Sequence, residues 1–132
     1  MNKKQNYKLV NDEYLLNEAN EEGVVKLPSC VLYKVLKNGD GKVSPNKNSV
    51  VTVHYTGTLI NGRKFDSSKA GVAPAFRLNE LIIGWQEALT RMKVGDKWMV
   101  YIPAKLGYGA RTSGDIPGNS TLIFEIELFS IA

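Results

Sequence analysis

An apolar stripe runs through the stretch IIGWQEALTRM at residues 82–92. Four large apolar residues recur in it at spacings of three and four, which is typical of one face of an α-helix. They are Ile82, Trp85, Leu89 and Met92. We expect the polar residues, Gln86 among them, on the other faces, and Gly95 as the helix stop. A helix of about ten residues is marginal alone in water, so packing against the rest of the chain must hold it.

The segments on both sides of this helix have apolar residues at every second position, which is typical of β-strands, and the segment at residues 31–36 is apolar on both faces. Such segments cover residues 31–36, 51–59, 76–78, 98–102 and 122–128. The pair Asn61-Gly62 predicts a hairpin that returns antiparallel through Arg63–Asp66. Because strands precede and follow one helix without strand–helix alternation, the sequence predicts an α+β fold with an antiparallel sheet around a short helix.

A second helix is predicted near the N-terminus, after a frayed segment at residues 1–7. Asn11 can cap this helix, which would run to about Glu22, and Gly23 suits its end. Its narrow apolar edge could dock on the rest of the chain or on a partner. That edge consists of Tyr14, Leu15 and Ala19.

Composition restricts the function classes. The chain of 132 residues is long enough for one domain with a hydrophobic core, and its net charge is +4. Nucleic-acid binding is not expected, because the sequence has no basic stripe with interleaved aromatic residues. No apolar run is long enough to span a membrane. The N-terminal region lacks the apolar segment of a secretory signal, which favours the cytoplasm; export after removal of a leader is the alternative.

Reactive side chains are few. One histidine and one cysteine cannot build a His/Cys metal cage or an internal disulfide, and we expect no metal and no cofactor. His54 falls on the polar face of its predicted strand, which favours a structural role. Asp66 is either a site carboxylate or a turn acid that caps backbone N–H groups, and the residues alone leave both open. The long loop from Ala104 to Ser120 is rich in glycine, and loops of this length are usually functional or mobile.

An ordered set of short motifs extends from Pro28 to Ala132. The motifs are VHYTG at 53–57, G at 62 with KFDSS at 64–68, IIGW at 82–85, KVG at 93–95, YG at 108–109, IP at 116–117 and STLIF at 120–124. In this order and spacing they resemble the FKBP family of peptidyl-prolyl cis–trans isomerases. The resemblance implies a twisted antiparallel half-barrel curled over one short helix. It also implies a division into an N-terminal helical extension, residues 1–23, as in a bacterial group of the family, and an isomerase domain, residues 24–132.

The resemblance further implies an activity and a set of site residues. The activity is rotation about X–Pro peptide bonds, assisted by binding of the twisted amide in an apolar aromatic pocket. The residues implied in catalysis are Tyr55, Asp66, Ile82 and Tyr108. Those implied in substrate binding are Phe65, Leu81, Trp85, Ile116 and Phe124. Two positions depart from the family pattern: Ala75 stands where a wall phenylalanine is expected, and Gly118 stands where a second proline is common.

The implied partners are proline-containing peptides and unfolded protein clients, with FKBP-class macrolide inhibitors as ligands of the same pocket. We expect a monomer without membrane or nucleic-acid partners. The alternative to an active isomerase is a weakly active or inactive chaperone module that binds proline-containing peptides. A third reading is a structural domain that interacts through the N-terminal helix.

Overall fold

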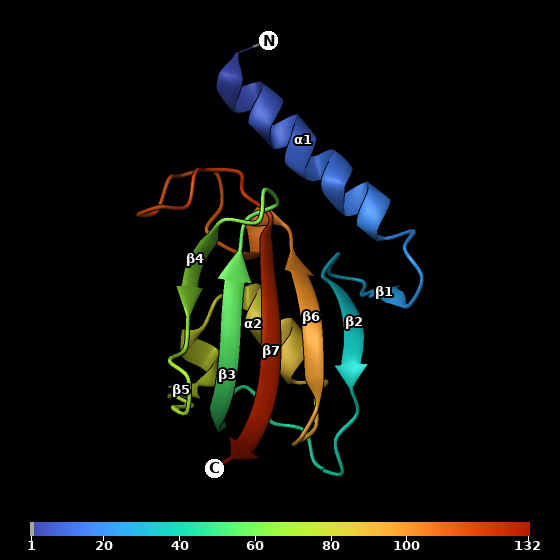
Figure 1. The fold of residues 1–132 in the computed structure, drawn as a ribbon, viewed down its shortest axis with the longest axis vertical. Coiled ribbons are helices and arrows are strands. Elements are labelled where there is room, and N and C mark those ends of the chain that lie inside the picture. Colours follow the sequence, from blue (N-terminus) through green and yellow to red (C-terminus); the bar gives the residue numbers. More distant parts are fainter. Residues whose placement is uncertain (1) are drawn as a thin grey trace.

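The computed structural model describes residues 2–132 as one antiparallel sheet with two α-helices. The α-helices are α1 (Lys3–Glu18) and α2 (Ile83–Leu89), and two 3₁₀ turns are η1 (Leu78–Glu80) and η2 (Ala104–Leu106). The strands are β1 (Val24–Lys26), β2 (Leu32–Lys37), β3 (Val50–Thr58), β4 (Lys64–Ser67), β5 (Ala75–Arg77), β6 (Lys97–Ile102) and β7 (Leu122–Ile131). Figure 1 shows α2 behind the sheet and α1 across one end of it.

The seven strands form a single sheet in the order β1-β2-β6-β7-β3-β4, and β5 pairs with β3. All pairings are antiparallel, and the longest joins β3 to β7. The predicted α+β class, with an antiparallel sheet around a short helix, is therefore confirmed. The hairpin predicted at Asn61-Gly62 is also present, because β4 returns along β3. The strand β1 was not predicted, since its three residues are too few to show an alternation.

The core lies between α2 and one face of the sheet. Alternate residues of the central strands are fully buried there, together with Trp85, Ala88 and Leu89 of the helix. Gly84 permits this close packing, because a Cβ at that position would lie 2.4 Å from Cγ2 of Ile102 on β6. The short helix is thus held by tertiary packing, as its length requires.

The helix α2 is shorter than predicted. It ends at Leu89, and Gly95 is not its stop. The hydroxyl of Thr90 donates to the carbonyl oxygen of Gln86 at 2.8 Å, and the backbone continues through tighter turns towards Met92. Met92 is nevertheless fully buried, so the predicted apolar stripe does face the core.

The helix α1 begins earlier than predicted. Asn2 caps it in a reciprocal pair of hydrogen bonds with Gln5, which is a capping box that the sequence interpretation overlooked. Asn11, the predicted cap, lies in the middle of the helix and is 1% exposed. The predicted frayed segment is therefore helical from Lys3 onwards, and the helix ends at Glu18 rather than near Glu22.

Within residues 2–132, the structure contains no helix that is both long and apolar enough to cross a membrane.

Candidate active site

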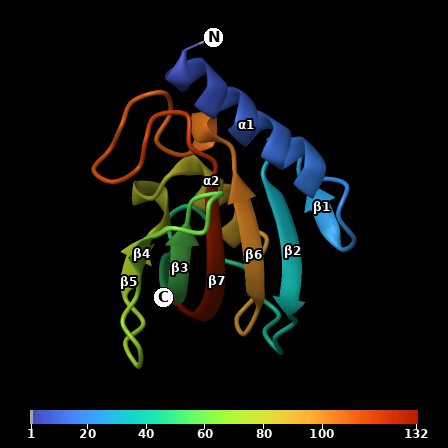
Figure 2. The same ribbon diagram turned by 45° about the horizontal axis from the view of Figure 1, so that its top comes forward.

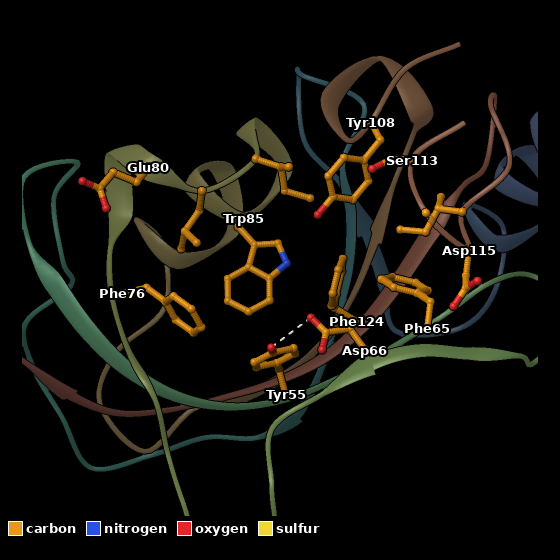
Figure 3. A pocket seen from close by; sticks show the side chains of 14 residues that line it. Tyr55, Phe65, Asp66, Phe76, Glu80, Trp85, Tyr108, Ser113, Asp115 and Phe124 are labelled. Carbon is orange, nitrogen blue, oxygen red and sulfur yellow. Dashed lines mark hydrogen bonds between the residues drawn. The ribbon is translucent and has the colours of Figure 1, made fainter. Parts of the chain in front are cut away.

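A cavity of about 510 Å³ opens at the start of α2, between β3, β4 and the loop that follows β6. All nine residues that the sequence analysis implied line it: Tyr55, Phe65, Asp66, Leu81, Ile82, Trp85, Tyr108, Ile116 and Phe124. Exposed residues form its rim, among them Asp66 and Tyr108, so the cavity opens to solvent. In Figure 3, the labelled side chains from β3, β4, α2, β7 and the loop after β6 converge on one space.

The indole of Trp85 forms the floor of the cavity and is 4% exposed. Three aromatic rings meet it edge to face: Tyr55 at 5.2 Å, Phe124 at 5.1 Å and Phe76 at 6.1 Å between ring centroids. Such contacts orient each ring beyond what simple burial would do. The floor is therefore a fixed apolar surface around one indole (Figure 3).

One wall depends on a glycine in β3. Phe65 and Phe124 pack edge to face at 5.5 Å directly over Gly57. A Cβ on Gly57 would lie 2.7 Å from atoms of both rings, so any side chain here would displace the wall. The glycine of the VHYTG motif thus has a packing function in the cavity.

A hydrogen-bonded pair stands at one side of the mouth. The hydroxyl of Tyr55 donates to Oδ2 of Asp66 at 3.0 Å. Burial and the adjacent Asp66 carboxylate raise the pKa of Tyr55 to about 12. The phenol therefore stays protonated at neutral pH and remains a donor. The carboxylate lies exposed in the mouth of the cavity, where it adds a polar group to an otherwise aromatic lining.

A backbone donor is left free where α2 begins. Ile82 is the N-cap residue, and among residues 2–132 its N–H donates to no acceptor. The preceding carbonyl, on Leu81, accepts a hydrogen bond of 2.8 Å from Nε2 of Gln86. Gln86, which was expected only on a face other than the apolar stripe, is buried at 7% exposure. Its amide fixes the segment that carries the free N–H. Unpaired N–H groups at helix starts are available to ligand carbonyls.

The loop after β6 covers the other side of the cavity. Tyr108 is 45% exposed, and its ring points towards the hollow, whereas Ile116 is 8% exposed and lines the cavity wall. Two backbone hydrogen bonds of 2.9 Å join Ser113 and Ile116. The guanidinium of Arg63 donates to the carbonyl oxygen of Asp115 and so ties this loop to the β3–β4 hairpin.

Phe76 belongs to the cavity and was missed. We expected the family's wall phenylalanine to be replaced by Ala75, but the structure places Phe76 in the wall, against Tyr55 and Trp85. The exposed Ala75 points away, because neighbouring residues of a strand face opposite sides. The apolar alternation of Phe76 with Leu78 was the available signal. Glu80, Ser113 and Asp115 also line the cavity and carried no comparable sequence signal.

His54 lies outside this cavity. Its Nδ1 is 2.8 Å from the hydroxyl oxygen of Ser68, and its ring packs edge to face on Phe129 at 5.2 Å. The same Ser68 oxygen accepts a hydrogen bond from the backbone N–H of Tyr55. These contacts fasten the end of β4 to β3, in agreement with a structural role for the histidine.

Comparison with known proteins decides the family. Residues 41–129 match the family described as "FKBP-type peptidyl-prolyl cis-trans isomerase". The chain belongs to the FKBP family. Among solved structures, a peptidyl-prolyl cis-trans isomerase from Pseudomonas syringae superposes with a TM-score of 0.92 at 34% identity, covering 100% of this chain and 98% of that one.

Two curated relatives are longer proteins. The FKBP-type isomerase FkpA of Aeromonas hydrophila is 46% identical over 91% of this chain and 45% of its own length. The "Outer membrane protein MIP" of Legionella longbeachae is 45% identical over 98% of this chain and 56% of its own length. The chain thus spans about half the length of these relatives, and the second alignment includes the region of α1.

Proposed function

We propose that this protein is an active peptidyl-prolyl cis–trans isomerase that accepts proline-containing segments of peptides and unfolded proteins. The observation that carries the proposal is the open aromatic cavity above Trp85, bordered by the free N–H of Ile82. Membership of the FKBP family supports the same activity.

The cavity suits this reaction because the reaction needs no reactive side chain. The barrier to rotation about a peptide bond is about 18–20 kcal/mol and arises from conjugation between nitrogen and carbonyl. Rotation breaks that conjugation and reduces the charge separation between oxygen and nitrogen. A twisted amide therefore loses less hydration free energy than a planar one when it moves from water into an apolar cavity. A rate gain on the order of 10⁴ requires only about 5–6 kcal/mol of preferential binding of the twisted form.

The proposed roles follow from the position of each group. The prolyl ring lies on the Trp85 indole, between the rings of Tyr55, Phe65, Phe76 and Phe124. The N–H of Ile82 donates to a substrate carbonyl oxygen beside Leu81. From the opposite side, the hydroxyl of Tyr108 donates a second hydrogen bond, and Ile116 closes the rim. The Tyr55–Asp66 pair lies beside the carbonyl that rotates.

Four finer expectations accompany this proposal. We infer that FKBP-class macrolides would bind in the same cavity, with Phe76 supplying the wall that Ala75 was expected to lack. We further propose that the chain is a monomer, and that residues 1–23 form an extension of an isomerase domain at residues 24–132. The cytoplasmic location stays a prediction, with export as its alternative, since one relative is named an outer membrane protein.

The test is an isomerisation assay by exchange NMR on a short peptide with one X–Pro bond. We expect the protein to accelerate exchange between the cis and trans forms of the peptide. If the protein is fully folded and does not accelerate this exchange, the proposal is overturned. Trp85→Leu should lower peptide affinity roughly tenfold, because the floor of the cavity is lost. Trp98→Leu is the matched control: Trp98 is 5% exposed in the core and does not line the cavity, so it should lose stability without loss of turnover per folded molecule.

A further inference from the structure

The helix α1 is joined to the loop of the proposed site by specific polar contacts. The hydroxyl of Tyr7 is 2.7 Å from Oγ of Ser120, and Oδ1 of Asn11 accepts a hydrogen bond of 2.8 Å from the backbone N–H of Thr121. Ser120 and Thr121 are the last residues before β7, at the exit of the loop. Figure 2 shows α1 lying across this end of the molecule with the loop beside its N-terminal half.

Both polar atoms of the Asn11 side chain are hydrogen-bonded. Its side chain is buried, its Nδ2 donates to the carbonyl oxygen of Tyr7 at 2.8 Å, and its Oδ1 accepts from Thr121. An amide buried without partners would be unfavourable, so the two hydrogen bonds fix both the orientation of the side chain and the position of Thr121. A helix that merely extended the chain would not require a polar residue at this buried position.

The Tyr7 contact continues into the loop. Oγ of Ser120 also lies 2.6 Å from the carbonyl oxygen of Pro117, which can only accept a hydrogen bond. A serine hydroxyl has a single hydrogen to donate, so Ser120 donates to Pro117 and Tyr7 donates to Ser120. The resulting chain of hydrogen bonds, from Tyr7 through Ser120 to Pro117, ends one residue from Ile116 in the cavity wall.

We propose that α1 completes the isomerase site, with Tyr7 and Asn11 as positioning residues that hold the loop exit so that Ile116 closes the cavity. The proposal rests on the proposed function, because it concerns the same cavity. Neither residue lines that cavity, so each acts through Ser120 or Thr121. Loss of either contact should let the loop leave the cavity more often, and a peptide that needs the closed loop then binds more weakly.

Tyr7→Phe and Tyr14→Phe form a matched pair. Both remove one tyrosine hydroxyl from the same helix, but the ring of Tyr14 packs 6.5 Å from that of Tyr101 on β6, away from the loop. We expect Tyr7→Phe to raise KM roughly fivefold with kcat within about twofold, which is the size of one lost hydrogen bond. Tyr14→Phe should change only the unfolding midpoint.

A second readout does not depend on turnover. The N–H of Ile116 donates to the carbonyl oxygen of Ser113, so its hydrogen exchange reports whether this part of the loop is closed. Exchange at Ile116 should accelerate in Tyr7→Phe and stay unchanged in Tyr14→Phe. Ser120→Ala also loses the hydrogen bond to Pro117, so its effect should be at least as large as that of Tyr7→Phe. The double variant should be no worse than Ser120→Ala alone.

The outcomes separate the two proposals. If the wild-type protein does not catalyse isomerisation, the proposed function fails, while Ile116 exchange and peptide affinity still test the positioning role. If Tyr7→Phe and Tyr14→Phe leave KM and Ile116 exchange equally unchanged, α1 only stabilises the fold and the positioning role is refuted. Should Tyr7→Phe not fold, Ser120→Ala decides alone: unchanged KM and Ile116 exchange would refute the proposal.

Discussion

The hydroxyl of Tyr55 on β3 donates a hydrogen bond of 3.0 Å to Oδ2 of Asp66 on β4. The ring of Tyr55 packs against Trp85 at the floor of the cavity, whereas the Asp66 side chain is exposed at its mouth. One contact thus connects the apolar floor to the polar rim. It places a carboxylate at the mouth of the cavity, beside the carbonyl that rotates in the proposed reaction.

Asp66→Ala should lower kcat/KM roughly tenfold while costing less than about 1 kcal/mol of unfolding free energy. The stability cost is small because an exposed hydrogen bond contributes little to folding. Exchange NMR and urea unfolding measure the two quantities. His54→Ala is the control, because it removes another hydrogen bond between β3 and β4 outside the cavity. Unchanged turnover in Asp66→Ala would remove Asp66 from the site.

Ile82→Pro tests the free backbone donor directly. The φ of Ile82 is −56° and Leu81 before it is extended, so proline fits this backbone and removes only the N–H and part of the side chain. We expect peptide affinity to fall about tenfold with little change in unfolding free energy. Ile82→Val keeps the N–H and should bind nearly as the wild type. Equal affinities of the two variants would show that the N–H does not contact substrate.

Cys30→Gly should stabilise the protein by about 0.5–1 kcal/mol. Cys30 has a φ of 79°, a left-handed conformation that glycine adopts without steric cost. The greater freedom of glycine in the unfolded chain offsets part of the gain. Cys30→Ala removes the thiol but keeps the Cβ, so it should give no such gain. Urea unfolding of both variants checks this prediction. Equal unfolding free energies of Cys30→Gly and Cys30→Ala would show that any change comes from loss of the thiol and not from the backbone conformation.

Alkaline pH should destabilise the protein through Tyr101. Burial, with the nearby carboxylate of Glu18, raises the pKa of Tyr101 to about 12. An unfolded tyrosine loses its proton near pH 10, so between about pH 10 and pH 12 the folded state binds more protons and stability falls as pH rises. Below about pH 10 this contribution is complete. When the pH rises from about 9 to about 11, the unfolding free energy of Tyr101→Phe should therefore fall by about 1 kcal/mol less than that of the wild type, as measured by urea unfolding. Lysine titration affects both proteins equally, so the comparison isolates Tyr101. Parallel profiles of unfolding free energy against pH would refute the prediction.

Local pattern predicted most of the strands and the position of the central helix. Residues that repeat with the period of a helix or strand, such as Trp85 and Leu89, must turn the same way wherever the element packs. The motif set placed Tyr55, Asp66 and Phe124 in one site, although they lie far apart in the sequence. The errors were local. The wall position of the cavity was assigned to Ala75 instead of Phe76, and a shift of one residue along a strand moves a side chain to the opposite face of the sheet.

The sequence by itself determined which residues are apolar and with what period, and hence the α+β class and the short central helix. Its resemblance to the FKBP family, and not that period, implied the residues of the aromatic cavity. Only the tertiary structure decided what the buried polar groups do. The sequence placed Gln86 only off the apolar stripe and suggested Asn11 as a helix cap, yet the two side chains hydrogen-bond to Leu81 and Thr121 inside the fold. The physical reason is that an apolar side chain needs only burial, which the spacing of apolar residues along the sequence predicts. A buried amide, in contrast, needs one particular hydrogen-bond partner. Asn11 and Thr121 are 110 positions apart, and even Gln86 and Leu81, five positions apart, meet only because the chain before α2 bends back on the helix.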